Sequence, residues 1–207
     1  MDEVEFYSRK IVEAMRMLYL KGLLTGLGGN FSVRLSNGLV LMTPSSSRPI
    51  FKMKYELEPE DLVVVDLGGR VVRGSANPTS ELPMHLAIYR ACERCRAVAH
   101  VHGTYSPLMD EGLADKLVMD TELELVFRPR ICFVGKFMPG SEELARAVSE
   151  KAREGCNIIY MKGHGVVAVH ENLTMALEFA ELAELLAERT IVARPLLEGL
   201  LRAGAGQ

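Results

Sequence analysis

The sequence lacks the features that would place the protein in a membrane or on a polyanion. Its 207 residues contain no apolar run approaching the ~18 residues that a membrane-spanning helix needs. The acidic start, Met1 to Glu5, is not followed by the apolar stretch of a secretory signal. An excess of basic residues is also missing, since 24 lysines and arginines stand against 27 aspartates and glutamates, a net charge of −3. We therefore expect a cytoplasmic protein with no membrane or nucleic-acid partner.

Tryptophan is absent and cysteines are few. Cys92 and Cys95 form a single CxxC, whereas Cys132 and Cys156 stand alone. A zinc ribbon needs a second CxxC, and no thioredoxin-like context surrounds this one, so neither site is indicated. We expect reduced thiols with a structural role, and a disulfide stays open because some hyperthermophiles keep disulfides inside the cell.

Length and composition indicate one globular domain, which we expect to cover residues 1–207. Hydrophobic residues make up 48% and charged residues 25%, and no linker or low-complexity run interrupts the chain. Apolar residues at helical spacing predict helices over residues 2–20, 81–92, 141–154 and 173–192. Short alternating or apolar runs predict strands over residues 30–35, 39–42, 62–65, 70–73, 97–102, 131–134, 157–161 and 166–169.

Two tight turns indicate the kind of sheet. Asn37-Gly38 separates the first two predicted strands, and Gly68-Gly69 separates the next two. Both are hairpin signals, which argue against a purely parallel, doubly wound sheet. The predicted fold class is therefore α/β, with a mixed, largely antiparallel sheet covered by helices.

Three histidines are candidates for metal binding. His100 and His102 alternate on a predicted strand, so their side chains lie on the same face, ~6.6 Å apart along the chain. Two polar histidines at a strand end are an equally good interpretation of that pair alone. His164 favours the metal, because it lies between two glycines in a turn, where a histidine contributes little packing. Three histidines with one open position form a catalytic rather than a structural zinc site.

Glu81 lies at the predicted start of a helix, where it would either favour the helix dipole beside an N-cap Ser80 or reach a metal or a substrate proton. His85 follows four residues later on the same helix face, and we expect it to pack or to support the site rather than to bind the metal. His170 is interpreted as an exposed turn residue.

Three polar stretches are candidates for binding an anion. Each combines small residues with N–H and O–H groups at a turn or a helix start. They are Gly28-Gly29-Asn30, Ser45-Ser46-Ser47 and Thr79-Ser80.

Taken together, these stretches resemble the class II aldolase/adducin family. The resemblance covers about residues 5 to 190, and its motifs occur in the family's order. They are Gly28-Gly29-Asn30-Phe31-Ser32, Thr43-Pro44-Ser45-Ser46, Thr79-Ser80-Glu81 with His85, His100-Val101-His102 and Lys162-Gly163-His164-Gly165.

The resemblance implies a three-layer α/β/α fold with a central, mainly antiparallel sheet, in a homotetramer with active sites at subunit interfaces. It implies one zinc ion per subunit, bound by His100, His102, His164 and Glu81, with Glu81 also the catalytic base. It further implies a phosphate site made of Gly29, Asn30, Ser45, Ser46, Thr79 and Ser80. The implied reaction is the reversible cleavage of a ketose 1-phosphate, such as L-fuculose 1-phosphate, to dihydroxyacetone phosphate and an aldehyde such as lactaldehyde.

The sequence departs from the family's pattern at one position. Aldolases of the family use a tyrosine from a neighbouring subunit as the acid toward the aldehyde oxygen, and it should fall near residues 119–121. Met119-Asp120-Thr121 stands there instead, and Tyr105 does not occupy that place. Asp120 is therefore the candidate acid or base, although a solvated loop charge is the more common interpretation.

Other activities of the family remain open. A methylthioribulose-1-phosphate dehydratase would share the metal and phosphate sites. A ribulose-phosphate 4-epimerase would carry aspartate at the position of Glu81. An adducin-like interaction module would share the fold without the metal ligands, and the three histidines with Glu81 argue against it.

Overall fold

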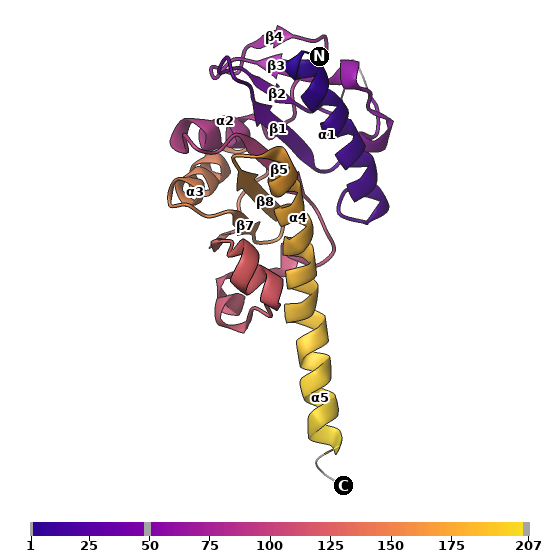
Figure 1. Ribbon diagram of the computed structural model, residues 1–207, viewed down its shortest axis with the longest axis vertical. Coiled ribbons are helices and arrows are strands. Elements are labelled where there is room, and N and C mark those ends of the chain that lie inside the picture. Colours follow the sequence, from indigo (N-terminus) through magenta and orange to yellow (C-terminus); the bar gives the residue numbers. More distant parts are fainter. Residues whose placement is uncertain (1, 48–50, 205–207) are drawn as a thin grey trace.

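A single eight-stranded sheet forms the centre of the protein (Figure 1). The computed structural model describes residues 2–47 and 51–204. The strand order is β4-β3-β2-β1-β5-β8-β7-β6, and every neighbouring pair is antiparallel except β6 and β7. The strands are β1 (Asn30–Arg34), β2 (Val40–Met42), β3 (Val63–Val65), β4 (Val71–Arg73), β5 (Ala97–Val101), β6 (Ile131–Val134), β7 (Ile158–Met161) and β8 (Gly165–His170). The predicted mixed, mainly antiparallel sheet is confirmed.

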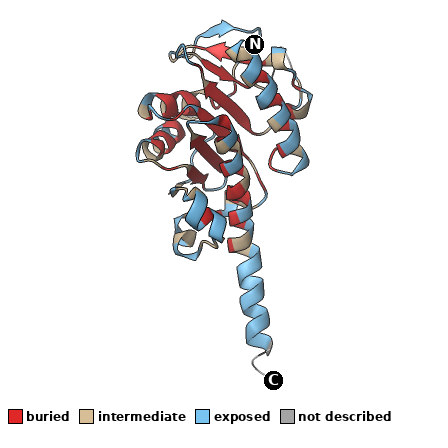
Figure 2. Cartoon of the chain, in the orientation of Figure 1, coloured by how far each residue is buried: buried red, intermediate tan, exposed pale blue. Residues whose placement is uncertain are grey.

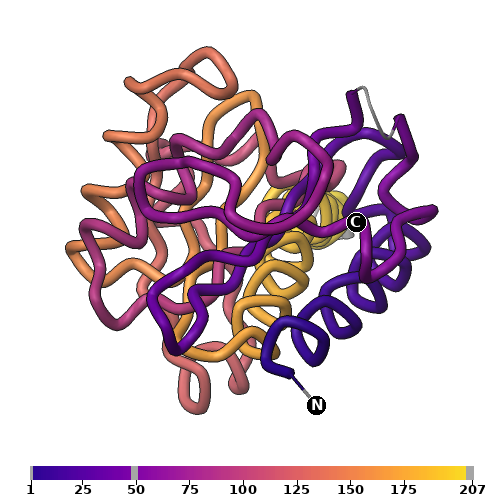
Figure 3. The backbone as a smooth tube through the Cα atoms, turned by 90° about the horizontal axis from the view of Figure 1, so that it is seen from above, coloured from indigo at the N-terminus to yellow at the C-terminus, as the bar shows by residue number. Residues whose placement is uncertain are grey.

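Helices cover both faces of this sheet. The α-helices are α1 (Glu3–Leu20), α2 (Leu82–Ala91), α3 (Glu142–Arg153), α4 (Leu173–Glu188) and α5 (Arg194–Gly204). One apolar core joins α1 and α4 to one face, and a second joins α2 and α3 to the other. Figure 2 shows that most of the sheet between them is buried and that the edge strand β4 is exposed, and Figure 3 shows the indigo α1 on the same side as α4. The structure therefore has the three-layer α/β/α architecture.

Alternation along the strands explains why the sheet has two apolar faces. In β5, Ala97, Ala99 and Val101 belong to the core under α1 and α4, whereas Val98 belongs to the core under α2 and α3. Successive strand residues point to opposite faces, so an uninterrupted apolar run is what a sheet covered on both faces requires. His100 is the polar exception in β5, and it is fully buried.

The predicted turns and caps locate most element ends. Gly38 adopts a left-handed φ of 85° in the β1–β2 hairpin, and the Asn37 side chain accepts the backbone N–H of Leu39 at 3.0 Å. The Ser141 hydroxyl accepts the N–H of Leu144 and caps α3, as the sequence predicts. No helix in the described part of the chain is both long and apolar enough to cross a membrane.

Two expectations are wrong. All four cysteines are paired: Cys92 bonds to Cys95, and Cys132 on β6 bonds to Cys156, which follows α3. The pairing of β6 with β7 brings the last two cysteines within a Cα separation of 6.0 Å, which a sequence separation of 24 does not reveal.

The last helix also extends beyond its predicted end at residue 192. α4 passes into a π-helical segment, Arg189–Ala193, and then into α5. Pro195 is the second residue of α5, which directly follows the π-helical segment, so the helix continues through it.

Candidate active site

Three histidines from two segments meet at the end of β5. His100 lies near the end of β5, His102 follows it, and His164 lies in the turn between β7 and β8. Strand β8 pairs with β5, so the turn that precedes β8 lies beside the end of β5. A side chain at Gly165 would place its Cβ 2.3 Å from the Val101 carbonyl oxygen, so only glycine permits this close approach. The ring centroids lie 4.4 to 5.0 Å apart.

The nitrogens of these rings are arranged as metal ligands. His100 Nδ1 lies 3.0 Å from the carbonyl oxygen of Val166, which only accepts, so Nδ1 carries the proton and Nε2 carries the lone pair. That Nε2 lies 2.7 Å from His102 Nε2. One ligand nitrogen from each of His100, His102 and His164 lies within 4.8 Å of the other two.

Burial keeps these imidazoles neutral. It lowers the pKa of His102 to about 4 and lowers the pKa of His164, and it holds the pKa of His100 well below its ordinary value. The mutual repulsion that the three rings would feel as imidazolium ions lowers the pKa of His100 and His102 further. Neutral imidazole is the form that binds a metal ion.

A buried carboxylate faces the histidines. Glu81 is the residue that precedes the first turn of α2, and its side chain caps no backbone N–H. Glu81, rather than the expected Ser80, thus holds the N-cap position. Its Oε1 lies 3.8 Å from His164 Nε2. Burial raises the pKa of Glu81, and the backbone N–H of Gly140 acts in the opposite direction.

Two residues of this group, Glu81 and His164, carry buried polar atoms without a partner. In the described part of the chain, four buried side-chain polar atoms have no hydrogen-bond partner: Ser46 Oγ, Glu81 Oε2, Ser106 Oγ and His164 Nδ1. Native structures leave few such atoms, and each is explained by strain, a catalytic role, or a water or ion that binds it. Three imidazoles and a carboxylate are a donor set that suits zinc and other divalent transition metals. The residues present therefore fit a metal ion.

A pocket of about 430 Å³ joins Glu81, His102 and His164 to the three predicted anion-binding stretches. Its volume is in the range of small-molecule sites. All six predicted phosphate residues line it: Gly29, Asn30, Ser45, Ser46, Thr79 and Ser80. The backbones of Pro44 and Pro78 form a β-bridge, which sets the second and third stretches side by side.

Asn30 is oriented by His85. The His85 ring is completely buried, and its Nε2 lies 2.6 Å from Asn30 Oδ1. Its Nδ1 lies 2.6 Å from the Ser32 hydroxyl, which in turn contacts the Tyr89 hydroxyl at 2.7 Å. Burial lowers the pKa of His85 to about 3, so the ring is neutral and donates to Asn30 from Nε2. His85 therefore supports a pocket residue, in agreement with the sequence-based expectation.

Two other predicted positions lie elsewhere. Asp120 does not line the pocket; its carboxylate accepts from Arg189 and from the N–H of Leu123. The Leu123 N–H and then Arg189 lower the pKa of Asp120, which works against a role as proton donor. His170 is the last residue of β8 and is half-buried rather than fully exposed.

Sequence reasoning missed one charged residue of the pocket. Lys54 lies in the short 3₁₀ helix η1 (Lys54–Glu56) and is buried against the pocket. Nothing in the residue pattern around it singled it out, because the segment between β2 and β3 shows neither helical nor strand periodicity.

Comparison with known proteins gives the family. The model of the Class II Aldolase and Adducin N-terminal domain matches residues 9–191. The chain belongs to this family. It is 36% identical to an L-fuculose phosphate aldolase of Methanococcus maripaludis over 189 residues, which are 91% of this chain and 95% of that protein.

Two further relatives of the chain are named as an aldolase and a decarboxylase. A 5-deoxy-D-ribulose 1-phosphate aldolase of Bacillus thuringiensis is 31% identical, covering 90% of this chain and 82% of that protein. A 3-oxo-tetronate 4-phosphate decarboxylase of Haemophilus influenzae is also 31% identical, covering 83% and 80%. The crystal structure of L-fuculose-1-phosphate aldolase from Thermus thermophilus superposes with a TM-score of 0.71 at 26% identity, covering both chains completely. Family and relatives together indicate an enzyme, a lyase of the class II aldolase type.

Proposed function

We propose that the protein is a metal-dependent sugar-phosphate aldolase. Its substrate would be a ketose 1-phosphate, L-fuculose 1-phosphate or a close analogue, cleaved to dihydroxyacetone phosphate and an aldehyde such as lactaldehyde. The observation that carries the proposal is the single pocket in which a metal-ligand set and a group of anion-binding side chains occur together. The aldolases among the relatives support the same reaction type.

The ligands of the metal would be His100, His102, His164 and Glu81. Zinc is the ion that the donor set suits best. When bound, a divalent ion supplies Lewis-acid polarisation of the substrate carbonyl. The unpartnered Glu81 Oε2 supports this assignment, because binding would satisfy a polar atom that otherwise lies buried alone.

The phosphate would lie against Gly29, Asn30, Ser45, Ser46, Thr79 and Ser80. Gly29 has a left-handed φ of 86°, and a Cβ there would meet Leu24 and the His100 carbonyl. Only glycine therefore fits at this position, and the conformation of this stretch of the pocket lining depends on it. The unpartnered Ser46 hydroxyl and the oriented Asn30 amide supply donors.

Glu81 would move the proton. In the direction of synthesis its carboxylate takes a proton from the hydroxymethyl carbon of dihydroxyacetone phosphate; in cleavage it returns that proton as the carbon–carbon bond breaks. Burial raises the pKa of Glu81 above its ordinary value, the direction that suits a group that must both accept and give a proton. A second group must exchange a proton with the aldehyde oxygen. Asp120 remains the residue that the sequence predicts for this role.

A decarboxylase is the second candidate, favoured by the Haemophilus influenzae relative. Loss of carbon dioxide from a 3-oxo acid leaves the same enediolate as aldol cleavage, so the same pocket would serve both. The dehydratase and epimerase alternatives remain predictions of the sequence. The non-catalytic module loses support, because the family and relatives indicate an enzyme.

The homotetramer also remains a proposal. Helix α5 extends away from the body of the subunit and is exposed on all sides (Figures 1 and 2). It carries four exposed leucines, Leu196, Leu197, Leu200 and Leu201, each 58–66% exposed. An exposed apolar strip of this kind is typical of a subunit contact. Light scattering on the full chain would give four times the mass of one chain if the proposal holds.

The reaction itself is tested by supplying L-fuculose 1-phosphate and measuring dihydroxyacetone phosphate with an auxiliary dehydrogenase. We expect release that stops when a chelator removes the metal and returns when zinc is added. Release of carbon dioxide from 3-oxo-tetronate 4-phosphate, with no cleavage of ketose 1-phosphates, would establish the decarboxylase instead.

A further inference from the structure

A buried lysine lies in the pocket with no role in the chemistry described above. Lys54 is only 3% exposed, and it lines the pocket together with Ser45, Ser46 and Glu81. Within the described ranges it is the one lysine or arginine of the pocket lining. Lysine is almost never fully buried unless it is paired. Its burial here therefore requires an explanation.

The contacts of Lys54 leave its charge uncompensated. Its Nζ donates one hydrogen bond, 2.9 Å long, to the carbonyl oxygen of Pro44. No carboxylate in residues 2–47 and 51–204 forms an ion pair with it, and burial alone lowers its pKa to about 8. At neutral pH most molecules therefore carry a protonated ammonium group with two N–H bonds that no described residue accepts.

The ammonium group lies beside the proposed phosphate site. Its acceptor, Pro44, directly precedes Ser45 and Ser46, and the Ser46 hydroxyl is one of the unpartnered atoms of the pocket. The charge of Lys54 also contributes to lowering the pKa of His102, so the ammonium lies near the histidine cluster as well. A ligand that reached from the histidines to the serines would pass close to it.

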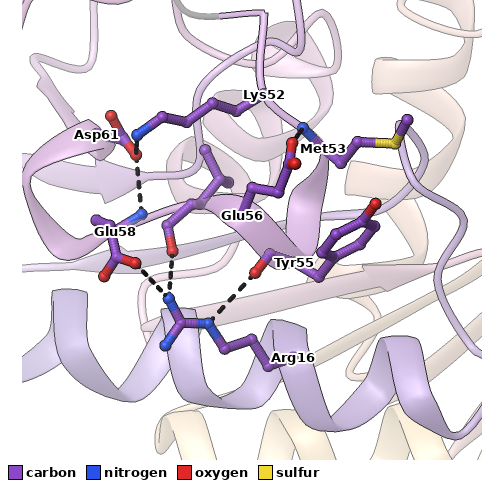
Figure 4. Close-up of polar contacts among 8 residues, drawn as sticks. Arg16, Lys52, Met53, Tyr55, Glu56, Glu58 and Asp61 are labelled. Carbon is purple, nitrogen blue, oxygen red and sulfur yellow. Dashed lines mark hydrogen bonds and ion pairs between the residues drawn. The ribbon is translucent and has the colours of Figure 1, made fainter.

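The backbone around Lys54 is fixed to helix α1. The Arg16 guanidinium donates to the carbonyl oxygens of Tyr55 and Leu57 at 3.3 and 3.0 Å and to Glu58 Oε1 at 2.7 Å (Figure 4). The N–H of Lys54 donates to the carbonyl oxygen of Gly26 at 2.7 Å, next to the glycine stretch that lines the pocket. Lys54 is thus held in place by its surroundings, rather than reaching the pocket as a free surface side chain.

We propose that Lys54 is the cationic residue that binds the substrate's phosphate and so selects phosphorylated over unphosphorylated sugars. The proposal rests on the proposed function for the identity of the ligand. A phosphate monoester carries close to two negative charges, whereas the other residues of the site are neutral donors. Lysine is an established point-charge partner of phosphate, and the uncompensated ammonium supplies the missing charge.

The test is a titration of the metal-loaded protein with inorganic phosphate, followed by ³¹P NMR. Lys54→Met removes the charge and keeps an unbranched apolar side chain; Lys54→Gln is the second variant, should the first not fold. Lys52→Met is the matched control, because Lys52 lies two residues away, pairs with Asp61 at 2.7 Å and does not line the pocket (Figure 4). The same proteins are then assayed with a ketose 1-phosphate.

We expect the Lys54 variants to bind phosphate at least tenfold more weakly and to raise KM for the ketose 1-phosphate by a similar factor, while kcat changes less than about threefold. Lys52→Met should match the wild-type protein. Unchanged phosphate affinity in a folded Lys54 variant would overturn the proposal, as would a fall in kcat with KM unchanged. If phosphate binding depends on Lys54 but the protein cleaves no ketose 1-phosphate, the proposed aldolase activity is refuted. The role of Lys54 in binding phosphate then still stands.

Discussion

Replacing Lys54 with methionine should make the metal-free protein more stable at neutral pH. Burial lowers the pKa of Lys54 from 10.5 to about 8. At 1.36 kcal/mol per pH unit, this difference disfavours the folded state by about 3 kcal/mol at pH 7. Methionine removes that cost, but it leaves the Pro44 carbonyl without its donor, which costs about 1 kcal/mol. The expected net gain in the free energy of unfolding is therefore about 2 kcal/mol.

The pH dependence has a definite sign. Between pH 8 and 10.5 the unfolded wild-type protein binds more protons at Lys54 than the folded protein does, so wild-type stability rises with pH across this window. Below pH 8 both states are protonated and the penalty is complete. The advantage of Lys54→Met should therefore be largest at and below pH 8 and disappear toward pH 10.5.

Urea unfolding at fixed protein concentration, in chelator, from pH 7 to 10.5 measures both quantities. Lys52→Met serves as the control, because Asp61 holds the pKa of Lys52 above its ordinary value and the side chain is partly exposed. A Lys54→Met protein that is less stable than the wild type at pH 7 would refute the reasoning. So would a stability difference that is the same at pH 7 and pH 10.5.

Three further outcomes follow from the site and the disulfides. His102→Ala should reduce bound zinc well below one ion per chain and abolish turnover, whereas His170→Ala, outside the pocket, should retain the metal; metal analysis of the purified proteins decides this. Glu81→Gln should lower kcat by about 10² to 10⁴ while keeping the fold and much of the metal, and retained turnover in a steady-state assay would exclude Glu81 as the base. Reducing both disulfides should lower the free energy of unfolding by at least about 3 kcal/mol, most of it from Cys132–Cys156, which has the longer sequence separation of 24, and denaturant curves with and without a reductant would show no difference if neither bond forms.

Local chemistry was enough to predict most of the fold. The Asn37-Gly38 turn, the Ser141 cap and the apolar runs of the strands act over a few residues, so their effects are visible in the sequence. The convergence of His164 on His100 and His102 required more, namely the pairing of β8 with β5. The sequence suggested that convergence only through the family's order of motifs.

The rest depended on distances that a sequence does not contain. Cys132 and Cys156 meet because β6 lies beside β7. Lys54 enters the pocket because Arg16, on a distant helix, holds the segment that carries it. The predicted helix ended at residue 192, whereas the π-helical segment Arg189–Ala193 carries it into α5 and through Pro195.

The most direct test of the central claim is the exchange of solvent deuterium into dihydroxyacetone phosphate, followed by proton NMR, with and without a chelator. The account predicts loss of the signal at the hydroxymethyl carbon that requires the metal and is abolished in Glu81→Gln. An absence of exchange in wild-type protein with zinc shown to be bound would contradict it.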